Sequence, residues 1–269
     1  MINTVLAALR CPVCGEQLAQ PTAGSLRCPR GHSYDIAKQG YAHLGAGRRL
    51  PTGDTADMVT ARSAFLDAGH YEGVRAKLAQ LIPRDSGLIA DAGAGTGYYL
   101  AGALDAAPEA AGLALDVSKP ALRRAARAHP RAEAILADVW AGLPLRDGCL
   151  DVLLNVFAPR NGAEYARVLR PGGRLVVVTP LPEHLTQLRQ RYGLLDVDPG
   201  KAERLAATLR EFVPKSAEEL RWDMRLTASE VRVLVGMGPN AFHTDPPETG
   251  GLTEVTAAVR VAAYARPPA

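Results

Sequence analysis

From residue 88 onward, short apolar stretches alternate with segments whose apolar side chains recur every three or four positions. The first pattern predicts buried strands and the second predicts amphipathic helices. We expect strands at 88–91, 112–116, 134–137, 150–155 and 174–179, and helices at 98–106, 120–128, 163–169 and 183–192. This alternation is typical of an α/β fold built on a doubly wound, mostly parallel sheet with helices on both faces.

The segments on either side of this region carry weaker patterns. Two helices are expected before it, at 54–68 and 71–81, with Asp54 or Thr55 as the cap of the first. After residue 192 the chain predicts a strand at 221–226, a helix at 228–235 and a strand at 255–264, with the two strands forming an antiparallel pair at the edge of the sheet.

The same patterns suggest a division into three parts. Residues 1–45 lack the alternation and are expected to form a small N-terminal domain. Residues 46–86 are a linker with helices, and residues 87–269 form the large α/β domain.

The N-terminal part holds four potential metal ligands in two close pairs. They are Cys11, Cys14, Cys28 and His32, in the spacing C-x2-C-x13-C-x3-H, with proline or glycine beside each pair. Three cysteines and one histidine are a standard tetrahedral set for structural zinc, and a site filled by four protein ligands is closed to water. The alternative is a group of free or disulfide-bonded cysteines, but clustering in a chain without a secretion signal favours metal.

Composition adds two constraints. With 47% hydrophobic and 22% charged residues and no apolar run of membrane-spanning length, the chain is expected to be a cytoplasmic protein without a membrane segment. The first 50 residues hold six basic side chains against two acidic ones, a net +4, so that the remainder of this +3 chain carries −1. A polyanion partner would suit this distribution, but a solvated basic face would produce it too.

A glycine-rich turn follows the first strand of the large domain and reads Asp91-Ala-Gly93-Ala-Gly95-Thr96-Gly97-Tyr98. Glycines at alternate positions let the backbone approach a ligand closely, and such turns are where open α/β sheets bind nucleotides. Tyr98 stands where a dinucleotide-binding fingerprint needs its third glycine, so the pattern is D-x-G-x-G-T-G instead. The alternative is a glycine-rich turn that binds nothing.

Polar residues also follow the next three strands. Asp116 could accept hydrogen bonds from ribose hydroxyls, Asp138 from an adenine amino group, and Asn155 follows the fourth strand. A single aspartate at a strand end is usually a turn or cap residue. The series behind a glycine loop favours a nucleoside pocket.

These motifs, with residues 169–173 (Leu-Arg-Pro-Gly-Gly), resemble the class I S-adenosylmethionine (SAM) methyltransferases. Joined to the cysteine–histidine pairs and to residues 53–58, 65–71, 116–119 and 155–159, they resemble the 23S ribosomal RNA guanine-N1 methyltransferases, most closely the macrolide (tylosin-type) resistance branch. The resemblance spans nearly the whole chain.

The resemblance implies methyl transfer from SAM to N1 of a guanine in a 23S rRNA hairpin loop at the ribosomal peptide exit tunnel, with macrolide resistance as the result. It also implies a homodimer whose zinc domains grip the RNA. We assign SAM contacts to Asp91, Gly93, Gly95, Thr96, Gly97, Tyr98, Asp116, Val117, Asp138, Val139 and Asn155. Two other functions remain open: a methyltransferase acting on a small molecule such as an antibiotic scaffold, and a non-catalytic RNA-binding module.

The target base must leave its stack for N1 to reach the methyl group, so a wall beside the methyl is expected. We assign this wall to Asn155, Phe157 and Pro159, although Phe157 could equally be an ordinary core aromatic. His70 is a candidate base or SAM contact, and a packing histidine is the alternative. Candidates for phosphate contacts, or else members of solvated helix faces, are Arg62, Arg123, Arg124 and Arg127, with Arg48 and Arg49 in the linker.

Overall fold

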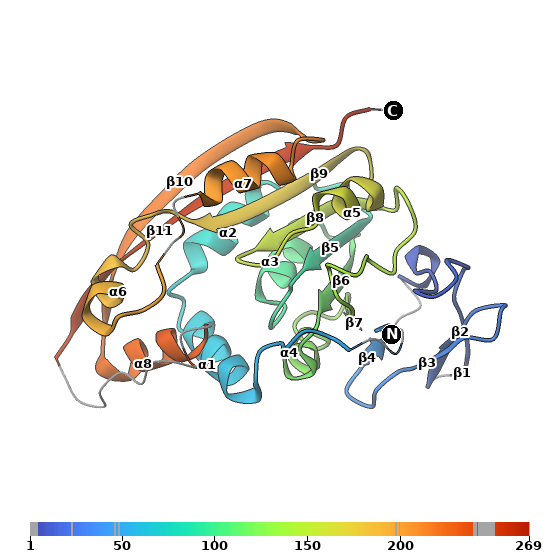
Figure 1. The fold of residues 1–269 in the computed structure, drawn as a ribbon, viewed down its shortest axis with the longest axis horizontal. Coiled ribbons are helices and arrows are strands. Elements are labelled where there is room, and N and C mark those ends of the chain that lie inside the picture. Colours follow the sequence, from blue (N-terminus) through green and yellow to red (C-terminus); the bar gives the residue numbers. More distant parts are fainter. Residues whose placement is uncertain are drawn as a thin grey trace.

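The computed structural model describes residues 5–22, 24–45, 47, 49–196, 198, 200–238, 241 and 251–268. One eight-stranded sheet organises the chain, in the order β10-β11-β9-β8-β5-β6-β7-β4 (Figure 1). Its strands are β4 (Tyr41–His43), β5 (Leu88–Ala92), β6 (Ala111–Asp116), β7 (Ala132–Leu136), β8 (Leu150–Val156), β9 (Leu169–Pro180), β10 (Val213–Leu226) and β11 (Thr253–Ala265). From β9 to β4 every neighbouring pair is parallel, so the mostly parallel sheet is confirmed.

Helices cover both faces of the sheet, which confirms the doubly wound arrangement. Apolar side chains on one face pack against α1 (Ala56–Asp67), α2 (Glu72–Gln80), α3 (Tyr98–Ala106), α4 (Lys119–Ala125), α6 (Thr186–Tyr192) and α8 (Ala228–Gly236). Those on the other face pack against α5 (Gly162–Val168) and α7 (Lys201–Thr208). The two faces form separate clusters of buried residues, as the strand alternation requires.

The predicted elements of the parallel region are confirmed with small shifts. Helix α3 has the predicted bounds, and α1 is capped by Thr55, whose hydroxyl accepts a hydrogen bond from the Met58 amide at 3.3 Å. Strand β9 begins at Leu169, five residues before the predicted start, because the chain leaves α5 directly into the sheet.

The C-terminal strands also pair as predicted, but their order is more specific. Strand β11 is antiparallel to both β9 and β10 and lies between them, which leaves β10 at the edge of the sheet. Strand β10 begins at Val213 instead of residue 221. Its first half is exposed on both faces, so no apolar periodicity marks it in the sequence.

The N-terminal domain is a small three-stranded antiparallel sheet, β1 (Ala19–Thr22), β2 (Ser25–Arg27) and β3 (Ser33–Asp35), preceded by the 3-10 helix η2 (Leu6–Ala8). It lies beside the β7–β4 end of the large sheet (Figure 1). The next strand, β4, pairs in parallel with β7 and so extends the large sheet, although it falls within residues 1–45.

This domain has no separate hydrophobic core among the described residues. Leu9, Leu26 and Tyr34 belong to the same buried cluster as Leu145 and Leu150 of the large domain. Backbone hydrogen bonds strengthen the junction, with the Arg10 amide donating to the Pro144 carbonyl and the Arg146 amide to the Ala8 carbonyl. The domain boundary at residue 45 therefore remains a prediction. The hydrophobic packing continues across it.

None of the helices in the described part of the chain is both long enough and apolar enough to cross a membrane.

Gly162, at the start of α5, provides a test of this packing. A Cβ at this position would lie 1.9 Å from the carbonyl oxygen of Thr208 at the end of α7, and a backbone atom cannot move aside cheaply. We expect Gly162→Ala to lower the free energy of unfolding by about 1–3 kcal/mol, the usual cost of overpacking. Urea unfolding followed by circular dichroism measures the change.

The matched control is Gly73→Ala in α2, where no atom lies within 4 Å of the added methyl group. Alanine has the higher helix propensity, so this variant should be more stable than the wild type by about 0.5–1 kcal/mol. Equal stabilisation by both substitutions would contradict the close contact between α5 and α7.

Candidate active site and metal centre

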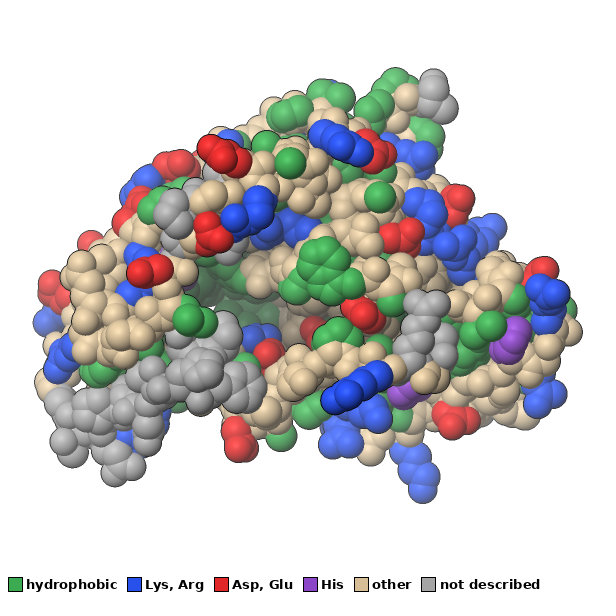
Figure 2. Space-filling view, in the orientation of Figure 1, with side chains coloured by type: hydrophobic (Ala, Val, Ile, Leu, Met, Phe, Trp, Pro, Cys, Tyr) green, Lys and Arg blue, Asp and Glu red, His purple; other side chains and the backbone are tan. Residues whose placement is uncertain are grey.

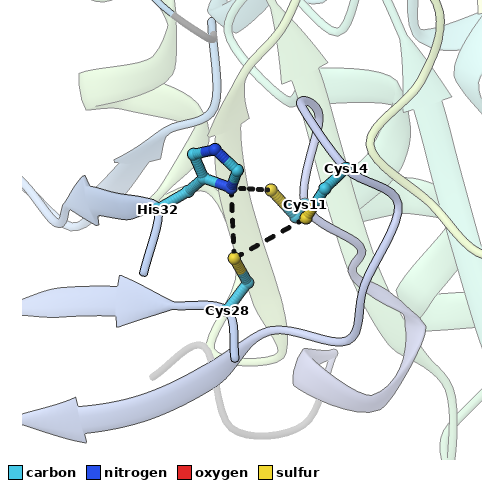
Figure 3. A group of neighbouring side chains, drawn as sticks. All are labelled: Cys11, Cys14, Cys28 and His32. Carbon is cyan, nitrogen blue, oxygen red and sulfur yellow. Dashed lines mark hydrogen bonds between the residues drawn. The ribbon is translucent and has the colours of Figure 1, made fainter. Parts of the chain in front are cut away.

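The four predicted metal ligands converge on one point (Figure 3). Their ligand atoms all lie within 4.8 Å of one another. Nδ1 of His32 is 3.3 Å from Sγ of Cys28 and 3.6 Å from Sγ of Cys11, while the Sγ atoms of Cys14 and Cys28 are 3.7 Å apart. Tetrahedral zinc would place sulfur atoms about 3.8 Å apart and sulfur and nitrogen about 3.6 Å apart, so the donor set fits the ion. All four cysteines of the chain are free of disulfide bonds.

Tight backbone turns beside each pair of ligands orient the ligand side chains. Gly15 and Gly31 have φ angles of 76° and 86°, and their amides donate to the carbonyl oxygens of Cys11 and Cys28. These are the tight turns expected from the glycine beside each pair.

Tyr34, which the sequence did not single out, supports the metal site from outside the ligand set. Its hydroxyl lies 3.0 Å from Sγ of Cys11, where it can donate a hydrogen bond to the thiolate. Burial opposes ionisation of Cys11, but this hydrogen bond and those of the local backbone lower its pKa to about 6. The site therefore favours the thiolate, which is the form that binds zinc.

The glycine loop lies between β5 and α3, at the carboxyl edge of the sheet. Gly93, Gly95 and Gly97 all have positive φ angles, of 83°, 54° and 81°, which other residues rarely adopt. A Cβ on Gly93 would lie 2.4 Å from the Cβ of Ala158, and one on Gly97 would lie 2.8 Å from the Cβ of Ala128. The loop therefore needs glycine for its own backbone and packing, in addition to any ligand.

Asp116 lies at the end of β6 and faces this loop. Its Oδ2 accepts the amide hydrogen of Gly95 at 2.9 Å, and its Oδ1 accepts that of Ser118 at 2.8 Å. Burial raises the pKa of Asp116, while the two amide hydrogen bonds act in the opposite direction. Each carboxylate oxygen keeps a second lone pair, so the group can still accept from two ribose hydroxyls.

Asp91 is the most unusual charged residue of the loop. Its side chain is 1% exposed, and neither carboxylate oxygen has a hydrogen-bond partner within the described part of the chain. Burial, together with the nearby Asp116 carboxylate, raises the pKa of Asp91 to about 8. An unpartnered buried acid is costly, and a cationic ligand beside it would relieve that cost. SAM carries an ammonium and a sulfonium group, so the residues fit this cofactor.

The remaining predicted cofactor residues border the same edge. Val117 is half-buried beside Asp116, and Thr96 lies within the loop. After β7, Oδ1 of Asp138 accepts the Trp140 amide hydrogen at 2.9 Å, and Val139 is buried. The Tyr98 hydroxyl points away from the loop and donates to Glu72 in α2 at 2.8 Å.

Asn155 lies at the end of β8 and is fully buried. Its side-chain amide nitrogen lies within hydrogen-bond distance of the carbonyl oxygens of Ala92 and Pro159 and of the Tyr165 hydroxyl. These contacts tie the glycine loop to the turn after β8. The environment therefore favours a positioning role for Asn155 over direct contact with a base.

Phe157 and Pro159 are exposed on that turn, as a base-binding wall requires. Phe157 is 41% exposed, so it is not an ordinary core aromatic, and its φ of 53° is unfavourable for a bulky residue. Because Ala158 touches Gly93, this turn lies directly against the glycine loop.

His70 has structural partners in α1 and α8. Its Nε2 is 3.0 Å from Oε1 of Glu230, and its ring stacks on Phe65 with centroids 4.6 Å apart. Glu230 also closes the capping box of α8 with Thr227, so His70 links α1 to α8. This arrangement favours the packing alternative for His70.

Among the phosphate candidates, Arg62 differs from the rest. It forms an ion pair with Asp54 at 2.5 Å, and its guanidinium lies 3.1 Å from the position of a Cβ on Gly95. Arg123, Arg124 and Arg127 are exposed on and just after α4, Arg49 is exposed, and Arg48 lies outside the described residues.

An aromatic group that the sequence did not predict adjoins Phe157. Tyr71, before α2, contacts Phe157, His184 and Trp222 edge to face, with centroid distances of 6.1, 6.4 and 5.2 Å. His184 follows β9 by four residues, so inspection of the chain after the fifth parallel strand would have found it. Figure 2 shows a hollow left of centre, which corresponds in Figure 1 to the region beside the carboxyl ends of the parallel strands.

Known protein families match both parts of this chain. The family model described as RlmA, N-terminal matches residues 9–45, and the model described as a methyltransferase domain matches residues 89–173. The YcgJ protein of Bacillus subtilis shares the fold, with a TM-score of 0.50 at 14% identity over 75% of this chain and 100% of that one. A methyltransferase solved in complex with the Haloferax volcanii Trm112 activator gives 0.52 at 16% identity, over 81% of this chain and 100% of that one.

Two relatives match the chain over nearly its full length. A 23S rRNA (guanine-N(1)-)-methyltransferase of Micromonospora griseorubida is 54% identical over 97% of this chain and 98% of its own. The 23S rRNA (guanine(748)-N(1))-methyltransferase of Streptomyces fradiae is 46% identical over 96% of this chain and 97% of its own. With its zinc-ligand cluster, its glycine loop and these relatives, the chain belongs to the 23S rRNA (guanine-N1)-methyltransferase family.

Proposed function

We propose that this chain transfers a methyl group from SAM to N1 of a guanine in a 23S rRNA hairpin loop at the ribosomal peptide exit tunnel. The contact between Gly93 and Ala158 carries the proposal, because it joins the cofactor loop to the turn that bears Phe157. A base stacked on Phe157 would then lie next to the bound methyl donor. The two relatives named for this reaction on 23S rRNA support the choice of substrate.

When bound, SAM supplies a methyl group on a sulfonium, which an in-line nucleophile displaces. The main task of the protein is to position the two partners. We propose that Asp116 holds the ribose hydroxyls, Asp138 the adenine, and Asp91 the cationic end of the cofactor. Asn155 would keep the two loops in register through its contacts with Ala92 and Pro159.

On the substrate side, the guanine must leave its stack and lose the N1 proton. Phe157 and Pro159 are proposed to form the wall against which the extruded base lies. The exposure of both residues supports this role. His70 is given no part in proton transfer, because its ring packs on Phe65 and pairs with Glu230, which serves the contact between α1 and α8.

The zinc ribbon is proposed to grip the RNA. Its exposed basic side chains support this role, since phosphate contacts provide most of the affinity for nucleic acid. They are Arg27, Arg30, Lys38 and, just after the domain, Arg49. Methylation of a ribosomal target further implies a cytoplasmic location and, at the exit tunnel, resistance to macrolides.

The test of this function is a transfer assay with labelled SAM. The wild-type protein is incubated with a 23S rRNA hairpin, with a macrolide scaffold, or with neither, and the label is located. We expect label on the guanine N1 of the RNA only. Label on the macrolide would favour the small-molecule methyltransferase, and binding of the RNA without transfer would favour the non-catalytic module.

The Asp116 assignment gives a quantitative prediction. Asp116→Ala leaves the ribose hydroxyls without their acceptor and should weaken SAM binding by about 1–3 kcal/mol. Isothermal titration calorimetry with SAM measures the loss. Asp67→Ala, which removes an exposed carboxylate at the end of α1, is the control and should bind as the wild type does. Unchanged affinity in Asp116→Ala would refute the assignment.

Loss of zinc should destabilise more than the N-terminal domain. Because Leu9 and Leu26 share a buried cluster with the large domain, Cys28→Ser should expose part of that cluster. We expect a loss of about 3 kcal/mol or more, or roughly 6–12 °C in the melting temperature at about 2–4 °C per kcal/mol. Differential scanning calorimetry, combined with metal analysis, measures both quantities.

Cys149→Ser is the matched control, because Cys149 lies outside the ligand cluster and is half-buried. It should retain one zinc per chain and lose little stability. Wild-type protein without zinc, or two variants that melt alike, would count against a structural metal.

We also propose a homodimer formed through the outer edge of β10. In the described part of the chain this 14-residue strand pairs only with β11, and an unpaired edge can accept a second strand. Glu219, Arg221, Asp223 and Arg225 alternate in sign on one exposed face. Antiparallel pairing of two copies about Trp222 would place Glu219 opposite Arg225 and Arg221 opposite Asp223, a self-complementary arrangement as two-fold symmetry requires.

Charge exchange tests this interface. Glu219→Arg alone and Arg225→Glu alone should each weaken the dimer about tenfold, because like charges then face each other in two symmetry-related pairs. The double variant, and an equimolar mixture of the two single variants, should recover dimerisation. Sedimentation equilibrium measures the dissociation constant, and a double variant weaker than either single one would exclude this pairing.

A further inference from the structure

Three aromatic side chains from loops far apart in the sequence surround one small space. The rings of Phe157 and His184 are nearly parallel, with an interplanar angle of 26° and centroids 6.2 Å apart. The Tyr71 ring is nearly perpendicular to both, at 81° to Phe157 and 77° to His184. We call this arrangement the aromatic slot: two walls, Phe157 and His184, with Tyr71 as its floor.

Hydrogen bonds at both ring nitrogens fix the orientation of His184. The Ala258 amide donates to Nδ1 at 3.0 Å, so this nitrogen is an acceptor and the neutral ring carries its proton on Nε2. Nε2 lies 3.3 Å from the Tyr71 hydroxyl oxygen, to which it donates. The wall is therefore an uncharged, flat ring anchored to β11 and to the floor of the slot.

Unfavourable backbone conformations at the aromatic slot also indicate a ligand site. Of the non-glycine residues that the structure describes, two have a positive φ: Phe157 at 53° and Leu185, directly after His184, at 56°. Such conformations are unfavourable for bulky side chains and cluster at ligand sites. Here one of these residues forms the first wall of the slot, and the other directly follows the second wall.

The dimensions suit a nucleobase. A base between two aromatic rings needs two stacking distances of about 3.4 Å, or about 6.8 Å in all. The walls are 6.2 Å apart, and Phe157 is exposed, so a small outward shift of that ring would admit a base. Contact of Ala158 with Gly93 places the slot next to the cofactor loop.

We propose that His184 is a positioning residue that stacks on the face of the target guanine opposite to Phe157. The inference rests on the proposed methylation of RNA and names the residue that completes its base-binding site. His184 acts through the flat ring alone, since both of its nitrogens already have protein partners.

Two substitutions separate stacking from hydrogen bonding. His184→Ala removes the wall and should lower kcat/KM for the RNA hairpin by about 5- to 150-fold, the range for loss of one base–aromatic stack. The KM for SAM should not change. His184→Phe keeps a flat ring but loses both hydrogen bonds, and it should restore most of the lost activity.

A fluorescent probe gives an independent readout. A hairpin with 2-aminopurine at the target position should be dim when bound to the wild type and to His184→Phe, because stacked rings quench its emission. Bound to His184→Ala it should be brighter. Unchanged kcat/KM in His184→Ala, or a His184→Phe variant as impaired as His184→Ala with SAM binding intact, would overturn the inference. Absence of RNA methylation by the wild type would instead overturn the proposed function.

Discussion

The backbone at Gly93 passes so close to Ala158 that no side chain fits between them, and the geometry of the site depends on this approach. With Gly93 in a left-handed conformation, the loop after β5 and the turn after β8 form one continuous surface. Asn155 strengthens this junction, because its side-chain nitrogen donates hydrogen bonds to the carbonyl oxygens of Ala92 and Pro159. Any movement of the glycine loop therefore moves the turn that carries Phe157, so the proposed donor and acceptor sites keep a fixed relation.

The zinc ribbon obeys a related constraint at the other end of the sheet. A domain of about 40 residues buries too little apolar surface to fold alone, and it compensates here in two ways. Four ligands converge on one metal position, and Leu9 and Leu26 complete the apolar cluster of the large domain. Because β4 then continues into the large sheet, an RNA segment held by the ribbon would be held at a defined distance from the methyl donor.

The sequence predicts those features that depend on local spacing. Helix α3, the Thr55 cap and the four zinc ligands need only periodicity, a hydroxyl at the right position or two close pairs of ligands. The sequence does not predict strand β4, which has only three residues and depends on its pairing with β7. It also misses the first half of β10, because that half is exposed and has no apolar pattern. Site residues divide in the same way. Inspection of the residues after each strand identifies Asp116 and Phe157 as candidates and would also have reached His184, four residues after β9. His70 gives no such signal, because Glu230, the partner that gives it a structural role, lies 160 residues away.

The distribution of charge across the site matches the reaction. Asp91, whose buried carboxyl group lacks a partner in the described structure, lies in the glycine loop, and the occupant proposed for that loop is a cation. The aromatic slot on the substrate side is uncharged, because the Ala258 amide keeps the His184 ring neutral. Methyl transfer removes the positive charge from the sulfur and gives a neutral methylguanine once the N1 proton has left. An ionised Asp91 would therefore favour binding of the charged donor and release of the uncharged thioether, not the transfer step itself, while the slot needs only to recognise a flat base.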